Sequence, residues 1–155
     1  KACEEIVKCS IIGIDTETKP SFKKGVVNSV ALLQIATDKR VYIIRLKSVN
    51  MSSELASIFS NKNIIKVGIA VRDDFKDLKK IHPFDEKSVV DINVLAPELG
   101  FESIGAKKLS ALVLGFRISK RQQVSNWELE ELTQAQINYA ATDAWICREI
   151  YLRLT

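Results

Sequence analysis

The stretch "IIGIDTETKP", residues 11–20, decides the fold, because it joins a core strand directly to charged side chains. Its first four residues form an apolar run rich in isoleucine, which predicts a buried strand. Side chains alternate between the two faces of a strand, so Asp15 and Glu17 share the face of Gly13. Two carboxylates on one face repel each other, and each is costly to bury alone. The alternative is that the strand has already reached solvent at Asp15.

The rest of the chain predicts a mixed sheet with helices packed on its faces. Two strands separated only by "TDK" indicate a hairpin, and the later strands alternate with helices. The last helix begins near Thr133, where Gln136 completes a capping box. We expect strands over 10–15, 30–36, 40–46, 63–70 and 88–92, and helices over 52–60, 71–81, 93–99, 106–115 and 133–154.

Bulk composition sets loose bounds on the class of protein. The 155 residues fit one domain, and 46% hydrophobic with 27% charged residues is ordinary for a soluble globular chain. A net charge of +4 permits an anionic partner such as nucleic acid without establishing one. Three scattered cysteines predict neither a zinc site nor a disulfide framework, so a reducing compartment is the simplest interpretation: the cytoplasm, or the nucleus of a eukaryote. No apolar run approaches the roughly 20 residues that cross a bilayer, so we expect no membrane partner.

A third acid lies on the inward line of the helix predicted from "VRDDFKDLKKI" (71–81). Asp74 follows Val71 by three residues and precedes Leu78 by four, and both of these are on the apolar stripe. Asp73 groups instead with the charged side chains. We therefore expect Asp73 to be solvated and Asp74 to turn inward. The alternative is an acid favoured near the start of the helix by the helix dipole.

The last helix carries a fourth acid of this kind. Asp143 lies on the apolar line of Cys147 and Ile150, four and seven residues later. A carboxylate is unusual on the buried line of a core helix. Tyr139 lies one turn before Asp143, so the phenol and the carboxylate are neighbours. The alternative is a simple Asp–Tyr pair at the edge of a core.

A divalent cation explains four inward carboxylates on three elements. Clustered carboxylates that would repel one another become ligands when a hard cation lies among them. Oxygen ligands without cysteine or histidine favour Mg²⁺ or Mn²⁺ over zinc. Two such ions about 4 Å apart serve phosphodiester displacement in many enzymes. Tyr139 would then orient or deprotonate the attacking water.

Three motifs together resemble the tyrosine-type branch of the DEDD family of 3′–5′ exonucleases. They are "IDTE" (14–17), "VGIAVRDDFKDL" (67–78) and "YAATDA" (139–144). The context "SNWELEELTQAQINYAATDA" is most similar to the exonuclease domain of the Werner helicase, and less so to ribonuclease D. The sibling branch uses a histidine near the last aspartate, whereas the only histidine here, His82, lies far from that motif. The resemblance extends from about residue 10 to 153.

The resemblance implies a ribonuclease H-like fold, with a central mixed five-stranded sheet flanked by helices, as one exonuclease domain over 1–155. It also implies removal of nucleotides from the 3′ end of DNA or RNA as nucleoside monophosphates, with two Mg²⁺ or Mn²⁺ ions. Carried over by position, the metal ligands are Asp15, which would bridge both ions, and Glu17, Asp74 and Asp143, and the catalytic tyrosine is Tyr139.

One departure and two alternatives concern the substrate. Relatives often carry "DTEW", whereas Thr18 follows the glutamate here, which leaves the preferred nucleic acid undetermined. One alternative is a catalytically weak nucleic-acid-binding module on the same fold, against which the presence of all five motif residues counts. The other is an exoribonuclease that matures RNA, which the sequence does not separate from the main hypothesis.

Basic and aromatic residues supply candidate contacts to nucleic acid. Lys19, Lys23 and Lys24 follow the first acid pair and could hold a phosphate backbone, or else simply solvate a loop. Phe22 and Trp127 are candidates for stacking on bases, although packing of the last helix is the alternative for Trp127. Further candidates along the same approach are Lys107, Lys108, Lys120 and Arg121.

Two other polar residues are assigned structural roles. Gln34, in "ALLQIA", either reaches the cleft or makes a hydrogen bond within the sheet, and we favour the second interpretation. Asp91 ends a short strand directly before a helix, so we predict a helix cap rather than a fifth metal ligand.

Overall fold

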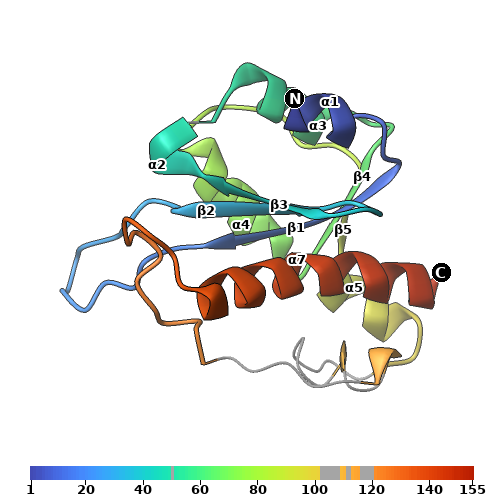
Figure 1. The fold of residues 1–155 in the computed structure, drawn as a ribbon. Coiled ribbons are helices and arrows are strands. Elements are labelled where there is room, and N and C mark those ends of the chain that lie inside the picture. Colours follow the sequence, from blue (N-terminus) through green and yellow to red (C-terminus); the bar gives the residue numbers. More distant parts are fainter. Residues whose placement is uncertain (50, 102–108, 111–112, 116–120) are drawn as a thin grey trace.

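A five-stranded mixed sheet forms the centre of the protein in the computed structural model (Figure 1). The structure describes residues 1–155 except 50, 102–108, 111–112 and 116–120. The strands are β1 (Ile11–Glu17), β2 (Leu32–Ala36), β3 (Val41–Arg45), β4 (Ile65–Gly68) and β5 (Val89–Asp91). The helices are α1 (Ala2–Ile6), α2 (Leu46–Val49), α3 (Ser53–Ser60), α4 (Val71–Lys79), α5 (Ile92–Glu98) and α7 (Gln134–Leu154).

The order of the strands is β3-β2-β1-β4-β5, with β1 in the middle. β1 pairs with β2 and β2 with β3 in antiparallel orientation, as the predicted hairpin requires. β1 pairs with β4 and β4 with β5 in parallel orientation, with α3 and α4 in the crossovers. The predicted five-stranded mixed sheet is therefore confirmed, and its central strand is the one that carries the acid pair.

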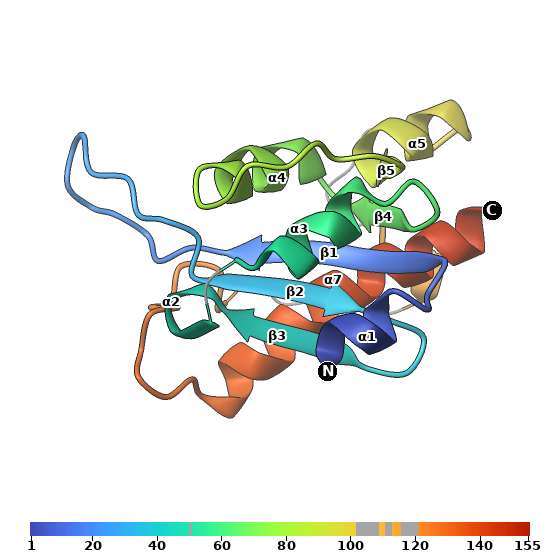
Figure 2. The ribbon, with the colours of Figure 1, turned by 90° about the horizontal axis from the view of Figure 1, so that it is seen from above.

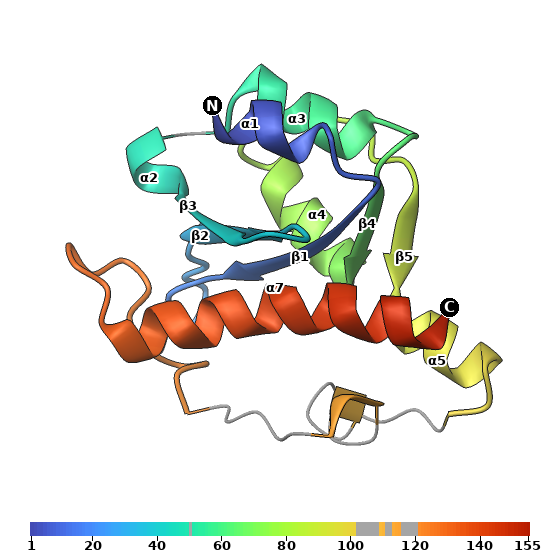
Figure 3. The ribbon, with the colours of Figure 1, turned by 45° about the vertical axis from the view of Figure 1, so that its right-hand side comes forward.

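Helices cover both faces of the sheet. α1, α3 and α4 lie over one face, and α7 crosses the other face with α5 beside its C-terminal end (Figures 1 and 3). Ile12 and Ile14 point to the first face and are fully buried in its core cluster. Gly13 points to α7 instead. This alternation fixes the face on which the acids of β1 lie, because Asp15 and Glu17 follow the same side as Gly13.

Side-chain caps begin three of the helices where the sequence predicts them. Ser52 and Asp91 accept hydrogen bonds from amide N–H groups of α3 and α5, at 3.2 and 2.9 Å. Thr133 and Gln136 form the predicted capping box of α7, with bonds of 2.9 and 3.1 Å. The assignment of Asp91 as a cap is confirmed, and these bonds satisfy amide groups that the first turn of a helix leaves unpaired.

The sequence missed two short helices, α1 and α2. They have five and four residues, too few for a periodic pattern, and they form where the chain packs against the sheet. Ile6 anchors α1 by complete burial in the core cluster of α3 and α4. Half of the helix predicted over 106–115 lies outside the described residues, and the described residues 109–110 and 113–114 are helical.

The backbone of α7 approaches β1 closely at Gly13. A Cβ atom built on Gly13 would lie 2.1 Å from the carbonyl oxygen of Ala144 and 3.2 Å from the Cβ of Arg148. Only glycine allows the helix backbone to approach the strand in this way. The close approach brings the α7 turn that contains Asp143 over the C-terminal half of β1.

Candidate active site

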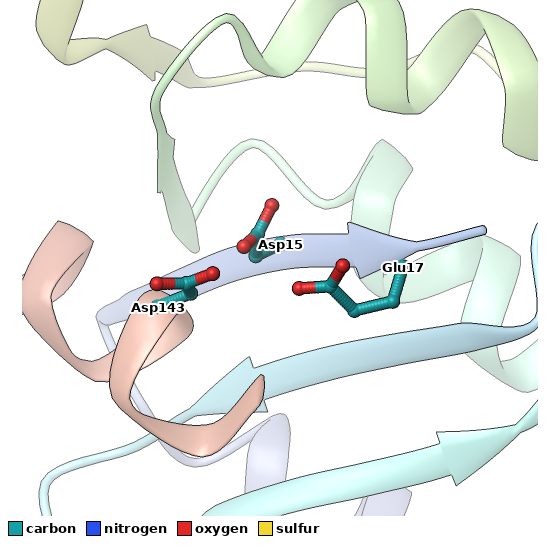
Figure 4. Close-up of side chains that lie close together, drawn as sticks. All are labelled: Asp15, Glu17 and Asp143. Atoms are coloured by element: carbon teal, nitrogen blue, oxygen red, sulfur yellow. The ribbon is translucent and has the colours of Figure 1, made fainter. Parts of the chain in front are cut away.

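Three carboxylates from two elements meet at the C-terminal end of β1. Asp15 and Glu17 extend from β1, and Asp143 extends toward them from α7 (Figure 4). One oxygen of each lies within 4.8 Å of the others. Glu17 is only 7% exposed, and Asp15 and Asp143 are partly buried. We call these three residues the acid cluster. All three carboxylates point inward, as the sequence predicts.

Asp74, the fourth predicted acid, lies beside the acid cluster rather than within its 4.8 Å group. It comes from the first turns of α4, where Asp73 is exposed and Asp74 is partly buried, as the helical spacing predicts. The hydroxyl of Thr16 donates a hydrogen bond of 2.6 Å to Oδ1 of Asp74. The charge of Asp74 nevertheless raises the pKa of Asp15, so the two carboxylates belong to one electrostatic system.

Burial and like charge raise the pKa values of Asp15, Glu17 and Asp74. Burial is the main cause for Asp15, whose pKa is well above its usual range, and the charges of Asp74, Asp143 and Glu17 add to it. Burial, then the charge of Asp143, raises the pKa of Glu17 to about 9. Burial raises the pKa of Asp74 to about 7, against the lowering effect of the bond from Thr16. The carboxylates are thus held together at an electrostatic cost.

The donor set fits a hard divalent cation. Oxygens of Glu17 and Asp143 lie within 4.8 Å of each other, and the raised pKa of Glu17, about 9, favours a proton on its carboxyl group at neutral pH. A cation among the same oxygens would replace that proton and relieve the repulsion. The cluster offers carboxylate oxygens without sulfur or imidazole, which is the ligand chemistry of Mg²⁺ and Mn²⁺.

Tyr139 lies one turn before Asp143 on α7, and its phenol hydrogen-bonds the Asp143 carboxylate. Burial and the charges of Asp143 and Glu17 raise the pKa of the phenol above its usual value. The ring stacks on Trp127 with centroids 5.9 Å apart and planes at 29°. Trp127 is completely buried, so it packs α7 and is not exposed for stacking on bases.

Gln34 is the site residue whose contacts the sequence interpretation gave only in part. It is completely buried, opposite Asp15 in the β1–β2 register. Its Nε2 donates a hydrogen bond of 3.2 Å to the Ala140 carbonyl of α7, and its side chain also hydrogen-bonds Glu17. The favoured interpretation, a bond within the sheet alone, is incomplete, because the amide also crosses from β2 to the helix. A polar residue facing Asp15 in an otherwise apolar strand was the available signal.

Most of the described candidate contacts to nucleic acid lie in one loop. Lys19, Lys23, Lys24 and Phe22 belong to the loop between β1 and β2, which projects away from the sheet (Figure 2). The three lysines are exposed, and Phe22 is 91% exposed. Arg121 is also exposed. The remaining candidates, Lys107, Lys108 and Lys120, lie outside the described residues.

A mixed sheet whose central strand ends in acids, crossed by a helix that carries Tyr-x-x-x-Asp, presents the clustered carboxylates that metal-dependent phosphodiester hydrolysis requires. Comparison with known proteins gives the family. The model of the family described as 3′–5′ exonuclease matches residues 1–155. The chain belongs to this family of enzymes, which confirms the predicted resemblance.

The chain is similar to the bifunctional 3′–5′ exonuclease/ATP-dependent helicase WRN of Mus musculus, with 31% identity over 152 residues. That match covers 93% of the chain and 11% of the relative. The Nibbler EXO domain of Aedes aegypti superposes with a TM-score of 0.88 at 26% identity, covering 99% of the chain and 81% of that structure.

Escherichia coli RNase D has the same fold, with a TM-score of 0.87 at 22% identity, covering 99% of the chain and 40% of that structure. The ribonuclease H-like architecture predicted from the sequence is thereby confirmed. The chain spans about half or less of several curated relatives, for example 51% of a 3′–5′ exonuclease of Arabidopsis thaliana. In the described part of the chain, no helix is both long and apolar enough to cross a membrane.

Proposed function

We propose that this protein is a metal-dependent exonuclease that hydrolyses the terminal phosphodiester at the 3′ end of DNA or RNA and releases nucleoside monophosphates. The observation that carries the proposal is the acid cluster, with carboxylate oxygens within 4.8 Å of one another and the Tyr139 phenol bonded to Asp143. Membership of the 3′–5′ exonuclease family supports the polarity of the reaction.

The acids hold the cations in this proposal. Asp15, Glu17, Asp74 and Asp143 are the proposed ligands of two Mg²⁺ or Mn²⁺ ions. Asp15 is the proposed bridging ligand, because the charges of all three other acids act on it. When bound, the ions would polarise the scissile phosphate, lower the pKa of water and stabilise the leaving oxygen. Thr16 keeps Asp74 in place through its bond to Oδ1.

Tyr139 orients the attacking water in this proposal. Its raised pKa keeps the phenol protonated at neutral pH, so it positions the water by hydrogen bonding rather than acting as a base. Of the two roles that the sequence left open, orientation is therefore the one we favour. Stacking on the buried ring of Trp127 restricts the phenol to one direction, which is the condition for effective positioning.

Nucleic acid is the proposed substrate, and the loop between β1 and β2 is its proposed contact. Lys19, Lys23 and Lys24 can reach phosphates, and the exposed ring of Phe22 can stack on a base. Asn28 closes the base of this loop by donating a 2.8 Å hydrogen bond to the Lys19 carbonyl. Two proteins of the same fold have been solved with nucleic acid: Trypanosoma brucei RNase D with the RNA U12, and Brucella melitensis NrnC with pGG.

The test uses 5′-labelled DNA and RNA oligonucleotides with Mg²⁺ or Mn²⁺, with and without a chelator. We expect a ladder of products shortened from the 3′ end, released mononucleotides, and no products in the chelator. The ratio of DNA to RNA cleavage separates a general exonuclease from an RNA-maturing enzyme. Binding of both oligonucleotides without cleavage of either would favour the binding-module alternative. Products shortened from the 5′ end would contradict the proposal.

A further inference from the structure

Gln34 is a polar side chain sealed inside the protein at the acid cluster. It lies in β2, whose five residues are all buried, and its own exposed fraction is 0%. Its neighbours in the strand, Leu33 and Ile35, are apolar and fully buried. Burying an amide in an apolar strand is unfavourable unless its hydrogen bonds are made inside the protein.

The amide of Gln34 interacts with groups on two different elements. Its Nε2 donates a hydrogen bond of 3.2 Å to the Ala140 carbonyl of α7. On the sheet, Gln34 lies opposite Asp15 in the register of β1 and β2, and its amide lowers the pKa of the nearby Glu17 carboxyl. The reverse orientation of the amide would place Oε1 against the Ala140 carbonyl, so that two acceptors would face each other. The hydrogen-bond pattern therefore fixes the amide with its nitrogen toward the cluster.

Among the described residues, the carbonyl oxygen of the same amide has no hydrogen bond that would offset the cost of burying it. Within the residues that the structure describes, Oε1 of Gln34 is buried and has no hydrogen-bond partner. An apolar side chain of the same size would avoid this penalty and would pack equally well in β2. The gain of having glutamine at this position lies in its bond to Ala140 and its interaction with Glu17, and the second of these reaches the acid cluster.

We propose that Gln34 is a positioning residue, which holds the Glu17 carboxylate in the acid cluster by bonding it and the Ala140 carbonyl at the same time. Ala140 lies between Tyr139 and Asp143, so the bond ties Glu17 to the α7 turn that supplies the other site residues. The inference rests on the proposed function, because it makes Gln34 an outer-shell partner of a metal ligand.

Lys66 provides the matched control. It is also completely buried in the sheet, and its Nζ donates to two main-chain carbonyls, those of Asn61 and Ile64, both at 2.7 Å. It pairs with Ile12 in the register of β1 and β4, so it lies on the face away from α7. Gln34→Met and Lys66→Met therefore remove buried donors from opposite faces of one sheet.

The experiment compares the two variants with the unmodified protein by crystal structure, Mn²⁺ titration calorimetry and steady-state kinetics. For Gln34→Met we expect Glu17 to leave the acid cluster, and Mn²⁺ affinity and kcat to fall about 10- to 100-fold. The KM for the oligonucleotide should change by less than about two-fold, because no substrate contact is removed. Lys66→Met should lower the melting temperature and leave Mn²⁺ affinity unchanged.

The position of Glu17 decides the inference whatever the activity of the protein. If Glu17 keeps its place in Gln34→Met and Mn²⁺ affinity is unchanged, Gln34 is not a positioning residue. If Gln34→Met does not fold, Gln34→Asn, which keeps the amide but withdraws it from Glu17, decides in the same way. Failure of the proposed function shows separately, as an unmodified protein that cleaves no oligonucleotide.

Discussion

The two faces of β1 differ in what they bury. Toward α3 and α4, the strand places Ile12 and Ile14 in a completely apolar cluster. Toward α7, the same strand places a glycine and two acids. One strand therefore serves stability on one side and charge concentration on the other, at adjacent residues.

Buried charges show the same contrast. Burial lowers the pKa of Lys66 to about 8, but its ammonium has two carbonyl acceptors at 2.7 Å. Burial and the charge of Asp143 raise the pKa of Glu17 to about 9, although Gln34 donates to its carboxylate. The face toward α3 and α4 satisfies its buried charge with protein groups, whereas the face toward α7 leaves charge for a ligand to neutralise.

The largest expected effect comes from removing one charge from the acid cluster. Asp15→Asn should reduce exonuclease activity by more than the about 10- to 100-fold typical of losing an outer-shell partner of a metal. Its free energy of unfolding in chelator should be equal to or higher than that of the unmodified protein, because repulsion is relieved. Chemical denaturation and single-turnover assays measure both quantities.

The control for this variant lies on the other face of the strand. Ile14→Ala should lower the free energy of unfolding by about 2–5 kcal/mol through the cavity it leaves, with activity retained in the folded fraction. Full activity of Asp15→Asn with Mg²⁺ would show that the acid cluster is not the active site.

Removal of the Tyr139 hydroxyl should have the next largest effect. Tyr139→Phe keeps the stacking on Trp127 and loses only the bond to Asp143. We expect kcat to fall by about 10²-fold, the cost of losing the orientation of a reacting group, and Mn²⁺ affinity to stay the same. Rapid-quench kinetics with calorimetry separates the two. A parallel loss of Mn²⁺ affinity would assign Tyr139 to metal binding instead.

Adding a methyl group at the contact between Gly13 and α7 should lower both stability and activity. Gly13→Ala would place a methyl group 2.1 Å from the Ala144 carbonyl oxygen, so α7 must shift away from β1. We expect a loss of about 1–3 kcal/mol in the free energy of unfolding, together with loss of activity as Asp143 moves. Ile11→Val is the control, with a cost of about 0.5–1.5 kcal/mol and unchanged activity. An unmoved α7 in the crystal structure of Gly13→Ala would refute this account.

The pH dependence of stability tests the charge that is buried on the face toward α7. The folded-state pKa of Glu17, about 9, lies above its unfolded value, so the folded state binds more protons between about pH 4.5 and 9. The chelated protein should therefore lose stability as pH rises through this window, by at most about 1.4 kcal/mol per pH unit for this group. Glu17→Gln should flatten the slope, measured by denaturation at a series of pH values. An equal slope in both proteins would contradict the raised pKa.

Local pattern was enough to find the acids but not the bonds that hold them. Asp74 and Asp143 were visible because each is a carboxylate on the apolar line of a helix, and periodicity places such a residue without tertiary information. Asp74 stands slightly apart because Thr16, whose side chain is on the opposite face of β1 from the cluster, binds it. That bond depends on where α4 docks, which no local pattern encodes.

The contacts that α7 makes with other elements could not be predicted from the sequence. The bond from Gln34 to Ala140 joins residues 106 positions apart in the chain, and the stacking of Trp127 on Tyr139 depends on a segment with no periodic pattern. The short helices α1 and α2 owe their existence to docking rather than to propensity. Residue spacing thus gave the strands, the long helices and the acids, while contacts between elements had to come from the structure.

The arrangement of α7 across β1 also has a consequence for biosynthesis. All five strands of the described sheet precede residue 134 in the chain. The ribosome therefore synthesises the residues of these strands before those of α7. A nascent or prematurely terminated polypeptide without α7 would carry Asp15 and Glu17 but neither Tyr139 nor Asp143. Under the proposed function, such a fragment could not degrade nucleic acid, and docking of the helix would be the moment at which the protein becomes a nuclease.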